Sequence, residues 1–343
     1  MTAPIELLNG RMFVDPDDLL ARSRAGERDV VVLSGTLLEG FGNPCSDLDL
    51  YVIGDHLPTK GPEEPTRLIV REDGRVRRVN ETLADPADML LDVQYYTFRE
   101  LETLARSLDS LYSESRRGTS LFSRTLHHED EDLIHKLLTG TVLQQGSPFE
   151  ARARFDPARF CFLKYRNQVG SYAEFRDLVG SWTAGDFDTC LFNARSYLIT
   201  QVSAMMFLAG HTNPRAKWFV RRLGSLNGTF TRLRDGVMHW LNAARRTDSQ
   251  KRDAIESAFE LIDLTYTHAR ELLGSSPLYY TAEEALQLTD REFAERTEKS
   301  RDMGAEWRMR RRMFCDSETS MVAQLRSQLR DPGVAAAPLA VSV

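Results

Sequence analysis

The chain has 343 residues, 42% of them apolar and 27% charged, and a formal net charge of −6. This composition supports a sizeable globular core and two domains, and the acidic balance argues against nucleic acid as the main partner. Because no apolar run approaches the roughly 20 residues of a membrane helix, no secretory signal opens the chain and four cysteines lie scattered, we expect a cytoplasmic protein without a membrane partner.

Strand and helix patterns are mixed over the first 140 residues. Asp-Pro-Asp-Asp at position 15 is typical of a helix start, and short runs rich in β-branched residues predict strands. The expected elements are a helix at 15–24, strands at 29–33, 47–53 and 90–97, a hairpin at 68–79 that turns at Asp73-Gly74, and helices from 98 and around 133–138.

The pattern becomes mostly helical after a junction at 146–148, and strands followed by helices favour an α+β fold over a doubly wound sheet. We expect a mixed sheet with flanking helices over 1–145, a helical domain over 146–330 and a disordered tail over 331–343. Candidate helices lie at 157–169, 171–182, 187–209, 214–223, 228–246, 249–273 and 282–329, the last broken near Thr289-Asp290.

Two aspartates, Asp47 and Asp49, stand two residues apart at the start of the apolar run 47–53. On a strand, residues with this spacing project to the same face. Half-buried carboxylates that close together are costly unless a cation pairs them. The spacing therefore predicts a divalent metal site.

A phosphate-binding turn is predicted just before this pair, where the apolar run 29–33 ends at Gly35-Thr36. Gly35 permits close approach of a ligand to the backbone, amide groups at a helix start favour phosphate, and Thr36 adds a hydroxyl donor. Ser46 and Asn43 either add hydrogen bonds to the ligand or only shape the loop.

These residues together resemble the signature of the polymerase-β-type nucleotidyltransferase superfamily, closest to its aminoglycoside and minimal nucleotidyltransferases. That signature is Gly-Ser, two variable residues, Arg-Gly, five variable residues and Ser-Asp-x-Asp. Gly35-Thr36, Gly40 and Ser46-Asp47-Leu48-Asp49 fit the spacing without a gap. Thr36 replaces the usual Ser, and Glu39 replaces the usual Arg, which leaves open which groups contact the triphosphate. The resemblance covers about residues 29 to 97.

The resemblance implies a third carboxylate on a later strand. Asp92 is the candidate, because it interrupts the apolar residues Leu91 and Val93. By resemblance, Asp47 and Asp49 bridge two Mg²⁺ ions, and Asp92 holds the ion that activates the acceptor hydroxyl. Glu81, Asp85 and Asp88 are the alternatives for the third ligand.

The stretch 189–234 contains seven Lys or Arg residues and no Asp or Glu. Lys217, Arg221 and Arg222 lie about one helical turn apart, so they could share a face that neutralises a triphosphate. Lys217 is the best single candidate for this role. The alternative is an ordinary solvated helix face.

The resemblance implies an enzyme that transfers a nucleoside monophosphate, AMP from ATP in the preferred reading, to a hydroxyl with release of pyrophosphate. Residues 1–145 would be the catalytic domain, and 146–330 would help to bind nucleotide and acceptor. A hydroxyl-bearing small molecule is the preferred acceptor. A protein or tRNA acceptor, as in toxin–antitoxin pairs, is the alternative, and so is a non-catalytic regulatory homologue. The resemblance also leaves open a homodimer.

Overall fold

The protein is described here from a computed structural model, covering residues 3–43, 45–59, 68–70, 75–83, 89–151, 154–295, 301–315 and 320–329. The chain divides into two compact units built from interleaved segments, whereas the sequence predicted one boundary at 145/146. The first unit comprises Met1–Ser110, Leu126–Pro157 and Thr212–Trp218, and the second comprises Leu111–Thr125, Ala158–His211 and Phe219–Val343. The expected tail at 331–343 and the turn at Asp73-Gly74 lie outside the described residues.

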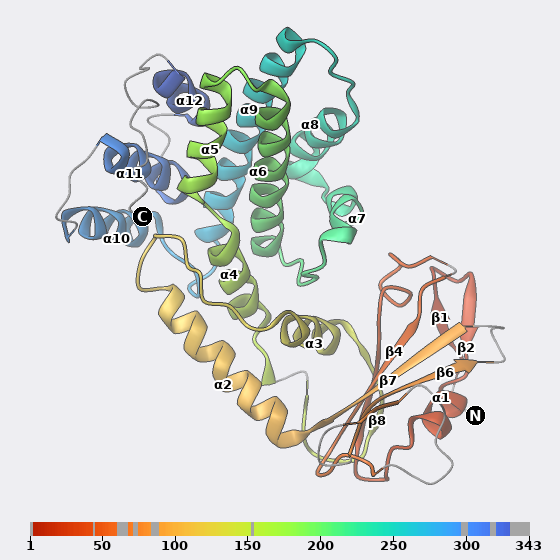
Figure 1. Ribbon diagram of the computed structural model, residues 1–343. Coiled ribbons are helices and arrows are strands. Elements are labelled where there is room, and N and C mark those ends of the chain that lie inside the picture. Colours follow the sequence, from red (N-terminus) through yellow and green to blue (C-terminus); the bar gives the residue numbers. More distant parts are fainter. Residues whose placement is uncertain are drawn as a thin grey trace, which may run out of the picture. The chain divides into compact units, whose positions relative to one another are not determined.

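A six-stranded mixed sheet forms the centre of the first unit, in the order β5-β6-β7-β4-β3-β8. Figure 1 labels β4, β6, β7 and β8 of this sheet. Strands β4 and β7 pair in parallel, and every other neighbouring pair is antiparallel. A separate two-stranded sheet joins β1 and β2. The strands are β1 (Ile5–Leu7), β2 (Met12–Val14), β3 (Val30–Ser34), β4 (Leu48–Gly54), β5 (Leu68–Val70), β6 (Val76–Leu83), β7 (Met89–Thr97) and β8 (Thr141–Gln145).

The predicted strands are confirmed, but β1, β2 and β8 were missed. The central strands β3 and β4 are buried at every position, as expected for continuous apolar runs in the middle of a sheet. By contrast, β8 lies at an edge and is half-exposed to exposed along its length, so it lacks the apolar pattern that would have predicted it. Strands β1 and β2 are only three residues each, too short for periodicity to be read.

Three helices accompany the sheet segments along the chain: α1 (Pro16–Ser23), α2 (Phe98–Ser115) and α3 (His128–Thr139). Helix α1 begins where predicted, because the Asp17 amide donates to the Asp15 carboxylate at 2.9 Å and Pro16 occupies the first turn. Helix α3 carries Glu129, Asp130 and Glu131 in its first turn, where acids favour the helix dipole. Charged side chains of α3, Lys136 among them, line the site described below.

The second unit is helical, with α5, α6 and α9 side by side at its centre (Figure 1). Nearly all of the second half of α6 is buried, from Gln201 to Leu208. None of the helices in the described ranges combines the length and apolarity needed to cross a bilayer. The helices are α4 (Pro157–Gln168), α5 (Tyr172–Thr183), α6 (Phe187–Leu208), α7 (Phe219–Ser225), α8 (Thr231–Asn242), α9 (Asp248–Leu273), α10 (Ala282–Glu295), α11 (Arg301–Phe314) and α12 (Met321–Leu329), with short 3₁₀ helices η2 (Ala216–Trp218) and η3 (Gly228–Phe230).

Two sequence predictions about these helices need correction. The predicted break near Thr289-Asp290 is wrong, because α10 continues through both residues to Glu295. The Thr289 hydroxyl donates to the Ala285 carbonyl at 2.7 Å, which keeps this polar residue inside a helix. The predicted helix 214–223 is split into η2 and α7. Lys217 therefore belongs to the first unit, and Arg221 and Arg222 belong to the second.

Candidate metal centre

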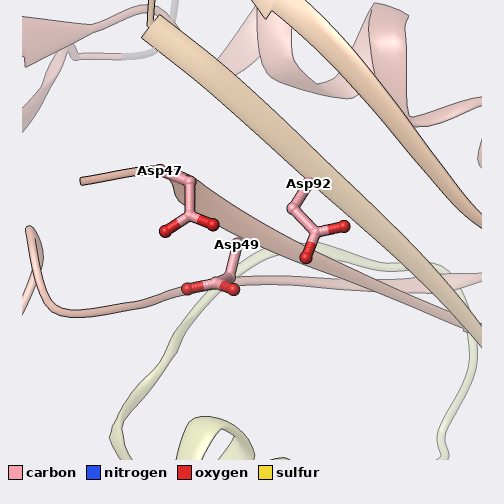
Figure 2. A group of neighbouring side chains, drawn as sticks. All are labelled: Asp47, Asp49 and Asp92. Carbon is pink, nitrogen blue, oxygen red and sulfur yellow. The ribbon is translucent and has the colours of Figure 1, made fainter. Parts of the chain in front are cut away.

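Three carboxylates from neighbouring strands converge at one end of the β4–β7 pair. The parallel register places Asp49 directly opposite Asp92, and Asp47 precedes β4 by one residue. One oxygen from each of Asp47, Asp49 and Asp92 lies within 4.8 Å of the other two. Figure 2 shows the three side chains turned toward one another. Among the described residues, these form the one group of three or more acidic, His or Cys side chains that could share an ion.

The carboxylates are held in place by the apolar residues on either side of them. Leu48 and Leu50 flank Asp49, and Leu91 and Val93 flank Asp92, all of them fully buried. Asp49 is only 9% exposed and Asp92 only 1% exposed. Burial raises the pKa of both groups, because a carboxylate loses hydration there, and the neighbouring Asp47 charge adds to the effect. The site is therefore costly to keep ionised without a cation.

Positively charged side chains contact two of the three carboxylates. The Lys136 ammonium on α3 contacts Asp49 Oδ2, and it opposes the rise in the pKa of Asp49. Arg78 Nε on β6 donates to Asp92 Oδ1 at 2.6 Å, and Gln94 Nε2 donates to Asp92 Oδ2 at 3.0 Å. The three carboxylates and two cations leave a net negative charge. Sequence reasoning missed Lys136, Arg78 and Gln94, since nothing in their spacing links them to the aspartates.

The Gly35-Thr36 turn follows β3 and touches the carboxylate site. Gly35 has a φ of +116°, which disfavours any side chain. A Cβ at this position would lie 2.5 Å from Asp49 Oδ2. The connection after Gly35 consists of turns from Thr36 to Gly40 rather than a helix start. Within them the Thr36 carbonyl accepts hydrogen bonds from the Phe41 and Gly42 amides at 2.9 and 2.7 Å. Gly35 thus brings the backbone directly against Asp49.

Ser46 and Asn43 brace the loop that leads into β4. The Asn43 amide donates to Ser46 Oγ at 3.0 Å, and the Ser46 amide donates to the Asn43 carbonyl at 2.9 Å. Cys45 between them is exposed rather than packed, with its amide bonded to Asn43 Oδ1 at 2.9 Å. These contacts favour the interpretation that the pair shapes the loop, and a contact from Ser46 to nucleotide stays a prediction.

Glu39, which stands where the family signature has Arg, is tied to α3. Its carboxylate lies 3.1 Å from His135 Nε2, and His135 Nδ1 lies 2.8 Å from the Thr212 hydroxyl. His135 is 2% exposed, so both ring nitrogens have their partners inside the protein. The contacts join the turn after β3, helix α3 and the segment before η2. Glu39 is therefore held by His135, which belongs to the same unit.

A cavity of about 540 Å³ opens over the three carboxylates. It belongs wholly to the first unit, because its walls come from the sheet, α3 and the segment 213–218. Arg215 in the wall pairs with Asp132, with Nε 2.8 Å from Oδ1. The residues predicted to bind nucleotide or metal that line it are Thr36, Asp47, Asp49, Asp92 and Lys217. Gly35 and Ser46 are not among the lining residues.

Lys217 differs from the two arginines with which it was grouped. It is exposed in the cavity wall, with Nζ 5.2 Å from the Trp218 ring centroid, and it pairs with no carboxylate in the described part of the chain. Arg222 instead is 2% exposed, and its guanidinium carbon lies 5.7 Å from the Phe207 ring centroid. The predicted shared face is therefore not confirmed: Lys217 is an available cation beside the site, and Arg222 is buried in the second unit.

Comparison of the chain with protein-family models and with curated proteins found no match.

Proposed function

We propose that this chain is a metal-dependent nucleotidyltransferase that moves a nucleoside monophosphate, AMP from ATP in the preferred case, to a hydroxyl group. The observation that carries the proposal is the convergence of Asp47, Asp49 and Asp92 within 4.8 Å beneath a cavity. The resemblance of Gly35-Thr36 and Ser46-Asp47-Leu48-Asp49 to the polymerase-β-type signature supports it. The cluster retains a net negative charge even with Lys136 and Arg78 in contact, which favours binding of a cation.

The donor set fits magnesium. Carboxylate oxygens are the ligands that Mg²⁺ prefers, and three side chains leave coordination positions for water and phosphate. When bound, two such ions would neutralise the phosphate charge and favour in-line displacement at the α-phosphorus. Asp47 and Asp49 would hold both ions, and Asp92 would hold the one nearer the acceptor.

Two other residues of the cavity wall, Thr36 and Lys217, suit the binding of a nucleotide. Thr36 lines the cavity together with Asp49, and Lys217 presents an ammonium that pairs with no carboxylate among the described residues. An ammonium of this kind suits the charge that develops on leaving pyrophosphate. The cavity volume of about 540 Å³ falls within the usual range of small-ligand sites. We therefore prefer a small molecule to a protein or tRNA as the acceptor.

Asp92 is our candidate for the proton acceptor. In the reaction the acceptor oxygen forms a bond to the α-phosphorus. The bond between that phosphorus and the oxygen that bridges the α- and β-phosphorus atoms breaks, and pyrophosphate leaves with the electron pair. The hydroxyl proton passes to a carboxylate oxygen.

The test follows the α-phosphate. The full chain is incubated with Mg²⁺ and nucleoside triphosphates labelled at the α- or the γ-position, with metabolite pools and with total tRNA as separate acceptors. We expect label from the α-position to appear on a small molecule with release of pyrophosphate. Asp47→Asn should abolish this transfer, and Asp92→Asn should slow it at least 100-fold while nucleotide binding changes less than about threefold.

Asp18→Asn is the matched control, because it removes an acid of the same unit that lies on α1 and does not line the cavity. It should leave transfer unchanged. Normal turnover in Asp47→Asn would refute the assignment, and transfer of the γ-label would indicate a phosphotransferase instead. Label on tRNA, with steep salt dependence, would replace the small-molecule acceptor.

A further inference from the structure

Lys136 places a positive charge directly against Asp49, one of the three candidate metal ligands. Its ammonium contacts Asp49 Oδ2, and its side chain is only 14% exposed. The same ammonium lies against the phosphate-binding turn, because a Cβ built on Gly35 would be 3.5 Å from Lys136 Nζ. One lysine therefore faces both a predicted metal ligand and the predicted phosphate turn.

An ammonium and a divalent ion compete for one carboxylate. Each satisfies the charge of Asp49, and the two cations repel each other strongly over a few ångströms in a partly buried site. Lysine is a compact charge on a flexible stem with three donors, so it can change partners without rebuilding the helix. Triphosphate oxygens at the Gly35-Thr36 turn are suitable new partners for it.

We propose that Lys136 is a positioning residue that holds Asp49 until metal and nucleotide arrive together, and then transfers its ammonium from Asp49 to a phosphate oxygen. The inference rests on the proposed function, since it assigns the nucleotide to the cavity. It makes binding of the two ligands cooperative: metal frees the ammonium for phosphate, and phosphate frees Asp49 for metal. Such coupling is reciprocal, so each ligand strengthens the other by the same factor.

The experiment measures Mn²⁺ binding rather than turnover. Free Mn²⁺ is followed by its paramagnetic resonance signal while it is titrated into the full chain, with and without α,β-methylene-ATP. In Lys136→Gln, Mn²⁺ alone should bind at least tenfold more tightly than to the wild type, because the competing charge is gone. The factor by which the analogue strengthens Mn²⁺ binding should fall at least tenfold.

Two further variants serve as controls. Lys136→Arg keeps the positive charge and should bind Mn²⁺ alone as weakly as the wild type. Lys251→Gln is the matched control, since Lys251 pairs with Asp188 at 2.8 Å in the second unit, outside the cavity. It should change neither quantity. Circular dichroism of each variant checks that α3 is retained, and Lys136→Met replaces Lys136→Gln if the latter does not fold.

The outcomes separate this inference from the proposed function. Unchanged or weaker Mn²⁺ binding by folded Lys136→Gln or Lys136→Met, without nucleotide, would overturn the inference. The label-transfer assay could still succeed in that case. Tighter Mn²⁺ binding together with undiminished coupling to the analogue would also overturn it, because the lysine would then have no role toward phosphate. Absence of transfer with every acceptor would count against the proposed function alone.

Discussion

Replacement of Gly35 by Ala should damage the metal site more than the fold. The φ of +116° disfavours a side chain, at a cost of about 1–3 kcal/mol in the free energy of unfolding. The new Cβ would also lie 2.5 Å from Asp49 Oδ2, whereas ordinary contacts begin at 3.4 Å. The oxygen must therefore move by about 0.9 Å. Because metal–oxygen distances tolerate only about 0.2 Å, we expect Mn²⁺ affinity to fall about 10-fold to 100-fold.

Gly210→Ala is the matched control for this change. Gly210 has a φ of +93°, and a Cβ there would meet no atom within 4 Å. Both variants should lose stability in urea unfolding, since both place a side chain at a positive φ, and Gly35→Ala should lose at least as much because its Cβ also meets Asp49. Only Gly35→Ala should lose Mn²⁺ affinity in the resonance titration. Wild-type affinity in a folded Gly35→Ala protein would refute the argument that this glycine sets the position of Asp49.

Two further predictions concern stability. Burial raises the pKa of Asp49 and Asp92 above 3.8, so the folded protein keeps these protons to higher pH than the unfolded chain. In metal-free buffer the free energy of unfolding should therefore fall as the pH rises from about 4 through the raised pKa values, and level off above them. Urea unfolding of Asp49→Asn/Asp92→Asn should show a smaller fall, since Asp130 and Glu174, whose pKa burial also raises, still contribute to it. An equal fall in the variant would contradict the assignment. His135→Ala leaves Glu39 and Thr212 without their shared partner. It should lower the free energy of unfolding, measured by urea titration, by about 1–3 kcal/mol. An unchanged midpoint of urea unfolding would show that these contacts do not stabilise the site.

The local elements of the site were readable because each depends on neighbouring residues. Alternation and apolar runs predicted β3, β4 and β7, and the Asp47-x-Asp49 spacing predicted two carboxylates on one face. Gly35 was predicted to let a ligand approach the backbone, and the structure shows that the Asp49 carboxylate lies close to this backbone. The stretch after it, interrupted by glycines, forms turns from Thr36 to Gly40, because glycines at close intervals do not support a regular element.

The charged partners of the aspartates were not readable, because they depend on strand register and helix packing. Arg78 reaches Asp92 only because β6 pairs antiparallel with β7 in one register, with Asn80 opposite Asp92. A slip of one residue would turn Arg78 to the other face. The alternative third ligands Asp85 and Asp88 lie outside the described residues. Glu81, on β6, pairs with Arg22 and Arg24 instead.

The amino-acid sequence by itself determined the central strands β3, β4 and β7, most helices and the pair Asp47 and Asp49, since hydrophobic period and residue spacing act over a few neighbours. Tertiary structure alone decided that Asp92 stands opposite Asp49 and that Lys136 contacts Asp49 from α3. It also decided that Lys217 and Arg222 belong to different units. These arrangements join residues distant along the chain, and their energies come from burial and from charge pairing that no local pattern encodes.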